Sequence, residues 1–274
     1  MGDWTGVLRL SAEEKNGKTI AKNVYFQGAY KVMRPIYHDE SGQACYYILN
    51  PGGGYLDGDR YQMKISLEKQ ARLTLTTQSA TKIYKTPHTH AYQETEFNLK
   101  EGSYLEYIPD PLIGYQNARY KQKNVVYIEK GCTFLYSDIV TPGWSPSGEK
   151  FTYDTLQFIN EIYMENELAV YDHIKLCPAK QNIDGLGLME GYSHLGSMIV
   201  INEKVDLDLL DRLYQAVDTQ TKEYKIGISL LAVPGFSVRV LANQTQIIES
   251  LFSEFHHILN QVWFNKTPSF LRKY

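Results

Sequence analysis

The stretch Pro51–Lys85 constrains the fold of this chain more than any other. It opens with three consecutive glycines, reaches Gly58-Asp59, and then carries apolar side chains at every second position. That alternation is the period of a β-strand with one buried face, so residues 60–69 and 71–77 are predicted to be strands. The glycines indicate backbone with positive φ or a close approach between two chain segments. The stretch therefore predicts a β-rich fold.

Short alternating segments of the same kind recur along most of the chain. Turn residues separate them at roughly ten-residue spacing, which is typical of an all-β body. Their order is compatible with stacked antiparallel sheets or with a solenoid-like stack, and the absence of a fixed-length repeat counts against a regular β-helix. The other predicted strands of this body are residues 4–13, 18–26, 45–49, 92–99, 103–108, 117–128, 132–140, 151–163, 167–176 and 195–202.

The C-terminal quarter of the chain has a different pattern. Leucines recur at helical spacing, two strands follow, and a long segment with one wide apolar stripe ends the chain. The predicted elements are a helix that Asp206 caps, strands 224–232 and 236–242, and a helix at 244–264. We therefore expect a mainly β fold in which residues 1–203 form the body. Residues 204–274 form a helix-strand-strand-helix layer packed on it, within one integrated domain.

Composition excludes several functional classes. The net charge is −3 and no basic block occurs, so the electrostatic footprint of a nucleic-acid-binding protein is missing. No apolar run reaches the length of about 18 residues that a membrane span needs, and the N-terminus lacks the regions of a signal peptide. The cysteines, Cys45, Cys132 and Cys177, are far apart, which favours a reducing compartment. We expect a cytoplasmic protein that binds neither nucleic acid nor membrane.

Motifs of enzyme active sites are absent from the sequence. It contains no GxSxG, Walker, HExxH or GxGxxG-helix pattern. The glycines at 52–54 precede a predicted strand, so they do not form the helix N-terminus that binds phosphate. The sequence therefore predicts that the chain is not an enzyme.

His88 and His90 are the first candidate for metal binding. Residues i and i+2 of an extended segment point to one face, so two imidazoles could share a soft divalent ion such as nickel. Two histidines without a third ligand make a weak site. An exposed loop after Pro87 is the competing interpretation.

Carboxylates inside apolar strands are the second candidate. Asp138 and Asp172 each interrupt an apolar strand, and a buried carboxylate is costly unless it is paired, hydrated or metal-bound. Asp59 follows the glycines. Thr77, Ser79 and Thr81 have the opposite parity from Thr74 and Thr76, so they are predicted to share a hydrated face. The competing interpretation is that each acid faces solvent or pairs locally with Lys or Arg.

An ordered set of short motifs covers nearly the whole chain. One such motif would be weak evidence, but the ordered set is specific. It comprises Trp4-Thr5-Gly6-Val7-Leu8-Arg9-Leu10, Arg34-Pro35, Cys45 to Pro51 with the glycines, Thr76 to Lys82, Leu105 to Pro111, Gln116-Asn117-Ala118-Arg119, Asp138, Gly148-Glu149 and Arg239. In this set the chain resembles the urease accessory protein family UreD, called UreH in some systems. The segment 142–149 departs from the family by lacking the arginines usual before Gly-Glu, which puts any contact made by those arginines in doubt.

The resemblance implies a non-catalytic urease maturation factor, a scaffold and nickel conduit. Its implied partners are the urease apoprotein, the accessory protein UreF and, through UreF, the GTPase UreG. It implies no tightly bound cofactor, because Ni²⁺ would pass transiently along a polar passage through the β body. The residues at the matching strand positions are Asp59, Thr81, Asp138 and Asp172.

The predicted docking surface for UreF is the C-terminal helix 244–264 together with the segment Phe264–Tyr274. The apolar stripe of the last helix is expected to belong to the core. Phe264, Phe270 and Tyr274 lie at its edge or beyond it and are the candidate contact residues.

Three rival functions remain open. The chain could be a stand-alone nickel metallochaperone using His88 and His90 with carboxylates, which a tight stoichiometric nickel site would favour. It could be a β-solenoid carbohydrate-active enzyme with Asp138 and Asp172 as its acid/base pair. It could also be an adaptor without a metal passage, in which the acidic residues have no role.

Overall fold

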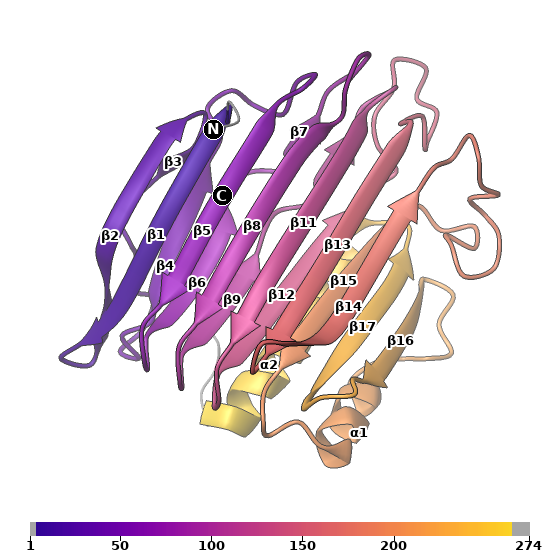
Figure 1. The fold of residues 1–274 in the computed structure, drawn as a ribbon. Helices are drawn as coiled ribbons and strands as arrows, with labels where there is room; N and C mark the ends of the chain where they lie inside the picture. The colour runs from indigo at the N-terminus through magenta and orange to yellow at the C-terminus, as the bar shows by residue number, and fades with distance from the viewer. Residues whose placement is uncertain (1–3, 265–274) are drawn as a thin grey trace.

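Two β-sheets lie face to face and make up most of the computed structural model, which describes residues 4–264 (Figure 1). The seven-stranded sheet runs in the order β14 (Glu167–Leu176), β13 (Thr155–Met164), β11 (Arg119–Ile128), β8 (Ala91–Leu99), β5 (Arg60–Leu67), β1 (Gly6–Lys15) and β2 (Lys18–Gly28). The ten-stranded sheet runs in the order β16 (Tyr224–Leu230), β17 (Gly235–Ala242), β15 (His194–Ile201), β12 (Thr133–Val140), β9 (Tyr104–Ile108), β6 (Arg72–Thr77), β4 (Ala44–Leu49) and β3 (Lys31–Val32), with β7 (Thr81–Ile83) and β10 (Leu112–Gly114) beside β12.

The chain winds between the sheets as a β-solenoid of about four turns. Strands β5, β8, β11 and β13 pair in parallel in one sheet, and β4, β6, β9 and β12 pair in parallel in the other. Antiparallel strands close both ends, with β2 and β3 at one end and β14 to β17 at the other. The predicted mainly β class is confirmed, and of the two alternatives the solenoid describes the centre of the molecule.

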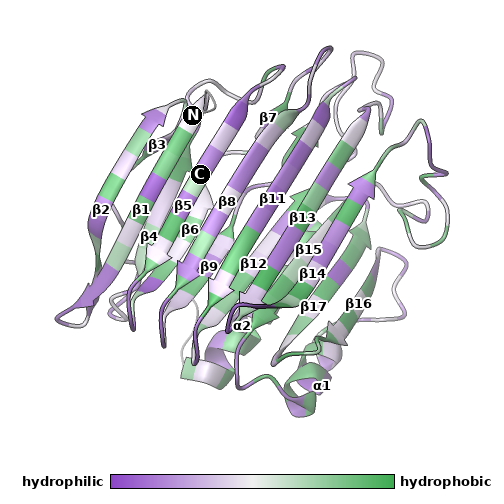
Figure 2. Cartoon of the chain, viewed as in Figure 1, coloured by the Kyte–Doolittle hydropathy of each residue, from purple (hydrophilic) through white to green (hydrophobic). Residues whose placement is uncertain are grey.

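Alternation along each strand builds the interior. Inward positions of β5, β8 and β11 are buried while most positions between them are partly exposed. Bands of opposite hydropathy follow one another along β5, whereas most of β8 and the first part of β11 are hydrophilic (Figure 2). The strands β3, β7 and β10 were not predicted, because two or three residues are too short to show a period. Strand β13 begins at Thr155, later than the predicted start at 151.

Two helices cover the outer face of the ten-stranded sheet. Helix α1 (Leu207–Gln215) begins at the predicted cap, where the Asp206 carboxylate accepts a hydrogen bond from the Leu209 N–H at 2.8 Å. Helix α2 (Thr245–Phe264) packs on β12, β15 and β17. Its buried residues are Ile248, Leu251, Phe252, Phe255, Leu259 and Trp263, so the predicted apolar stripe belongs to the core.

The C-terminal elements share a sheet with the body. Strand β17 pairs with β15 along its full length, and β16 extends the same sheet. This pairing supports our proposal that residues 1–203 and 204–274 form one integrated domain. Among residues 4–264, neither helix is long and apolar enough to cross a membrane.

Candidate functional site

A cavity of about 60 Å³ opens between the sheets near the ends of β6 and β7. This is room for a few water molecules. Thr77, Ser79 and Thr81 all line it together with Asp138, but so do Ala80 and Lys82, which have the opposite parity. Thr74 and Thr76 instead bond to Glu106 and to the Ile108 carbonyl.

The glycines before β5 shape the rim of this cavity. Gly53 and Gly58 both have φ of 76°, which favours glycine. At Gly54 a Cβ atom would lie 2.6 Å from the Lys82 carbonyl oxygen, so two chain segments meet there. Positive φ and close approach were the two predicted roles, and both are confirmed.

Asp138 is the buried acid of the cavity. It lies in the middle of β12 and is 8% exposed. The Tyr136 hydroxyl donates to its Oδ2 at 2.7 Å, while Oδ1 has no hydrogen-bond partner among residues 4–264. Ser197 lies beside Asp138, but its Oγ is likewise without a well-formed bond. Burial raises the pKa of Asp138 to about 6, against the lowering effects of Tyr136 and Arg239.

A chain of hydrogen bonds runs from Asp138 across the interior. Burial raises the pKa of its tyrosines, so their hydroxyls stay neutral and can donate. The links are Gln122 Nε2 to Tyr136 Oη (2.8 Å), Tyr120 Oη to Gln122 Oε1 (3.0 Å) and to Gln93 Oε1 (3.3 Å), Tyr55 Oη to Gln93 Oε1 (2.6 Å), and Tyr30 Oη with Tyr55 Oη (3.0 Å). The interior thus holds a continuous polar lining with little charge.

A second polar row crosses the seven-stranded sheet. Asn124, Asn160 and Asp172 are register partners on β11, β13 and β14. Asn124 Nδ2 donates to Asn160 Oδ1 at 2.8 Å, and Asn160 Nδ2 donates to Asp172 Oδ2 at 3.1 Å. Arg239 of β17 forms an ion pair with Asp172. Asn124 Oδ1 is a further buried acceptor without a partner among the described residues.

The two rows meet in the interior. Asp138, Ser197 and Arg239 are register partners across β12, β15 and β17. The charge of Arg239 lowers the pKa of Asp138 and the charge of Asp172 raises it, so Asp138 interacts electrostatically with both groups. Arg239 also lines a groove of about 560 Å³ between β14 and β16–β17. We name the path from the cavity through Asp138, Asn124 and Asn160 to Asp172 and Arg239 the polar track.

Asp59 lies away from the polar track. Its carboxylate accepts hydrogen bonds from Thr5 Oγ1 at 3.0 Å and from the Leu56 N–H at 2.8 Å, and it does not line the cavity. Its role in a passage stays a prediction. Sequence reasoning missed Asn124, Asn160 and Arg239 as site residues. The two asparagines occupy inward positions of alternating strands, and that parity was the available signal.

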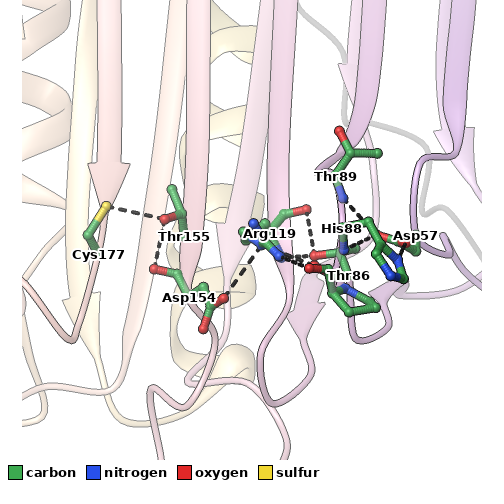
Figure 3. A network of polar contacts seen from close by, with 9 residues as sticks. Asp57, Thr86, His88, Thr89, Arg119, Asp154, Thr155 and Cys177 are labelled. Carbon is green, nitrogen blue, oxygen red and sulfur yellow. Dashed lines mark hydrogen bonds and ion pairs between the residues drawn. The ribbon is translucent and has the colours of Figure 1, made fainter.

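His88 and His90 lie on the loop before β8 and have separate surroundings. His88 Nδ1 is 2.7 Å from Asp57 Oδ2, and Asp57 also accepts from the backbone N–H of His88 and Thr89 (Figure 3). The backbone bond from Thr89 lowers the pKa of Asp57 most, followed by the hydrogen bond with the His88 side chain and then the backbone bond from His88. His90 packs edge-on against Tyr92. Across residues 4–264, no three His, Cys, Asp or Glu side chains gather as a metal site.

Comparison with known proteins reveals full-length similarity. The family model described as UreD urease accessory protein matches residues 5–273. The urease accessory protein UreD of Lachnoclostridium phytofermentans is 50% identical over 274 residues, covering 100% of both chains. Those of Staphylococcus epidermidis and Staphylococcus aureus are 45% and 43% identical over 273 residues, covering 99% of this chain and 98% of theirs.

Proposed function

The chain belongs to the UreD urease accessory protein family, and from this premise we propose that its polar track conducts nickel. Membership makes it a non-catalytic urease maturation factor that takes part in assembling the nickel metallocentre. The family forms complexes with urease accessory proteins and apo-urease. The proposal concerns how this chain contributes to that assembly.

The observation that carries the proposal is that Oδ1 of Asp138 has no well-formed hydrogen bond within residues 4–264 and that Asp138 lines a cavity with room for a few waters. A buried carboxylate oxygen without a donor gains from a cation. Carboxylates, amides and hydroxyls along the track are oxygen ligands that can replace part of an ion's hydration shell. Weak binding at each station is required, because an ion held tightly would not move on. Nickel is therefore cargo here, with no tightly bound cofactor.

The proposed stations follow the order of the track. Hydrated Ni²⁺ would enter the cavity beside Thr81 and meet the carboxylate of Asp138. The amide oxygens of Asn124 and Asn160 would then bridge the interval to Asp172. Neutral tyrosine hydroxyls complete the wall without adding binding strength.

We also propose the finer assignment of partners. UreF would dock at the end of α2, the urease apoprotein elsewhere, and the GTPase UreG would be reached through UreF. Phe264 is half-buried, with its ring 5.5 Å from that of Tyr104 and 4.3 Å from the Arg72 guanidinium. Phe270 and Tyr274 lie outside the described residues. Cys45, Cys132 and Cys177 are buried and are not joined in disulfides within residues 4–264, in keeping with the cytoplasm as the proposed location.

Asp138→Asn tests the passage directly. We expect urease co-expressed with this variant and the other accessory proteins to contain several-fold less nickel and to lose activity in proportion. The amide preserves size and the bond from Tyr136 but removes the charge. Asp184→Asn, an exposed acid, is the matched control and should behave as wild type. Unchanged nickel content with Asp138→Asn would favour the pure adaptor instead.

The same substitution should stabilise the fold. The pKa of Asp138 rises from 3.8 to about 6 on folding, so wild-type stability falls as pH rises through that interval. At pH 8 we expect Asp138→Asn to be about 3 kcal/mol more stable than wild type, and the difference should vanish near pH 4. Denaturant unfolding at both pH values measures this. Destabilisation at pH 8 would mean that Asp138 is a structural residue.

Deletion of residues 266–274 tests the UreF surface. We expect the truncated chain to capture much less UreF in a pull-down, because two of the three proposed contact residues are removed. Phe264 and all of α2 remain in this variant, so the helix that packs on the sheet is kept. Full retention of UreF would refute this placement.

A further inference from the structure

Arg239 is a positively charged side chain on a track that is proposed to conduct positively charged ions, which is unusual. It is 34% exposed and reaches Asp172 from β17, across the gap between the sheets. Its neighbours in register are Ser197 on one side and Gly227 on the other. A Cβ atom at Gly227 would meet nothing within 4 Å, so open space lies beside this stretch of β17.

The charges at this end of the track are coupled. Two carboxylates, Asp138 and Asp172, influence one another, and Arg239 offsets one of them. Without the guanidinium, the Asp172 carboxylate would keep the amide of Asn160 as a hydrogen-bond partner, but its negative charge would no longer be balanced. This unbalanced carboxylate, with the charge of Asp138 acting on it from nearby, would attract a divalent cation far more strongly than the present ion pair does.

We propose that Arg239 is an internal counterion that prevents Asp172 from trapping the passing ion. The inference rests on the proposed nickel passage and adds to it the residue that sets the affinity of its deepest station. An approaching cation competes with the guanidinium for Asp172. Arg239 then turns toward the groove of about 560 Å³ that it lines, and returns when the ion has left.

Arginine suits this role on physical grounds. Its guanidinium keeps its proton at any physiological pH, so it remains a charge that can be displaced but not neutralised. A histidine at this position would lose its charge near neutral pH and leave the negative charge of Asp172 unbalanced. The long, flexible side chain allows the charge to move without a change in the backbone of β17.

Nickel binding by the purified full chain tests the inference without urease. We expect Arg239→Met to bind Ni²⁺ about tenfold or more tightly than wild type in calorimetric titration, because one positive charge is removed from the site. Arg239→Lys, which keeps the charge, should stay near wild type. Adding Asp172→Asn to Arg239→Met should abolish the gain. No tightening in Arg239→Met, or tightening that survives in the double variant, would overturn the proposal.

A second arm separates this inference from the passage itself. In co-expression at limiting nickel, Arg239→Met should deliver less nickel to urease than wild type, because ions are retained at Asp172. If Asp138→Asn leaves nickel delivery to urease unchanged, the proposed passage is wrong. The calorimetric titration of Ni²⁺ binding still tests the role of Arg239 in that case. Circular dichroism checks folding. Arg239→Gln, whose amide can donate to Asp172, replaces Arg239→Met in both arms if that variant does not fold.

Discussion

Replacing His256 with alanine is expected to destabilise the protein by about 3–5 kcal/mol, because it leaves a buried carboxylate without its counterion. His256 Nε2 of α2 lies 2.6 Å from Glu106 Oε1 of β9. Thr74 Oγ1 donates to Oε2 of the same carboxylate at 2.8 Å, and the Tyr104 hydroxyl donates to Oε1. The pair joins the last helix to the centre of the ten-stranded sheet.

The pH dependence of this pair has a definite sign. Burial alone would raise the pKa of Glu106, but the charge and hydrogen bond of His256 outweigh it and lower the pKa to about 2. Its contribution is present above the unfolded value of 4.5 and is lost as pH falls toward 2. The pKa of His256 is raised by Glu106 against burial, so its contribution is full below 6.5 and is lost as pH rises through the folded pKa. The pair therefore contributes most between these two unfolded values.

Denaturant unfolding between pH 2 and pH 9 measures both effects. His257→Ala, on the same helix, is the matched control and should change stability little, since His257 has no ion-pair partner within residues 4–264. The loss caused by His256→Ala should be larger at pH 6 than at pH 9. A loss that is equal at both pH values would show that His256 acts through packing and not through its charge.

Phe255→Ala should cost about 3–5 kcal/mol, since this side chain is fully buried between α2 and the sheet. If the chain is one integrated domain, the whole protein should lose stability and still unfold in a single transition. Val262→Ala, at a position of the same helix that is 40% exposed, is the matched control and should cost much less.

The shape of the unfolding curve decides the domain proposal. Tyrosine fluorescence and far-ultraviolet circular dichroism should report the same midpoint for Phe255→Ala if β15–β17 couple the helices to the body. Two separate transitions would mean that residues 204–274 unfold independently of residues 1–203, and the proposal of one domain would be wrong.

Several features of the site were predictable because they depend on neighbours in sequence. The parity of Thr77, Ser79 and Thr81 placed them on one face, and the structure puts all three on the cavity. The cap at Asp206 and the apolar stripe of α2 follow from local spacing in the same way. Asp138 was identified as an acid within an apolar strand, and its burial follows from that pattern.

Other features depend on where the solenoid turns bring distant segments. Glu106 and His256 are 150 residues apart, and neither strand nor helix periodicity predicts that they meet. Arg239 reaches Asp172 across 67 residues because β17 and β14 lie in facing sheets. Local patterns could not predict the direction of strand pairing either, because side chains alternate between the two faces in the same way in parallel and antiparallel strands.

The sequence by itself determined the family, the β class, the positions of most strands and which side chains face inward, because alternation and motif order are local properties. Only the tertiary structure decided that the central strands run parallel, that Oδ1 of Asp138 lacks a well-formed hydrogen bond within residues 4–264, and that Arg239 balances Asp172. The reason is physical. Pairing and charge compensation are contacts between chain segments far apart in sequence, and the geometry of the solenoid turns selects which of them form.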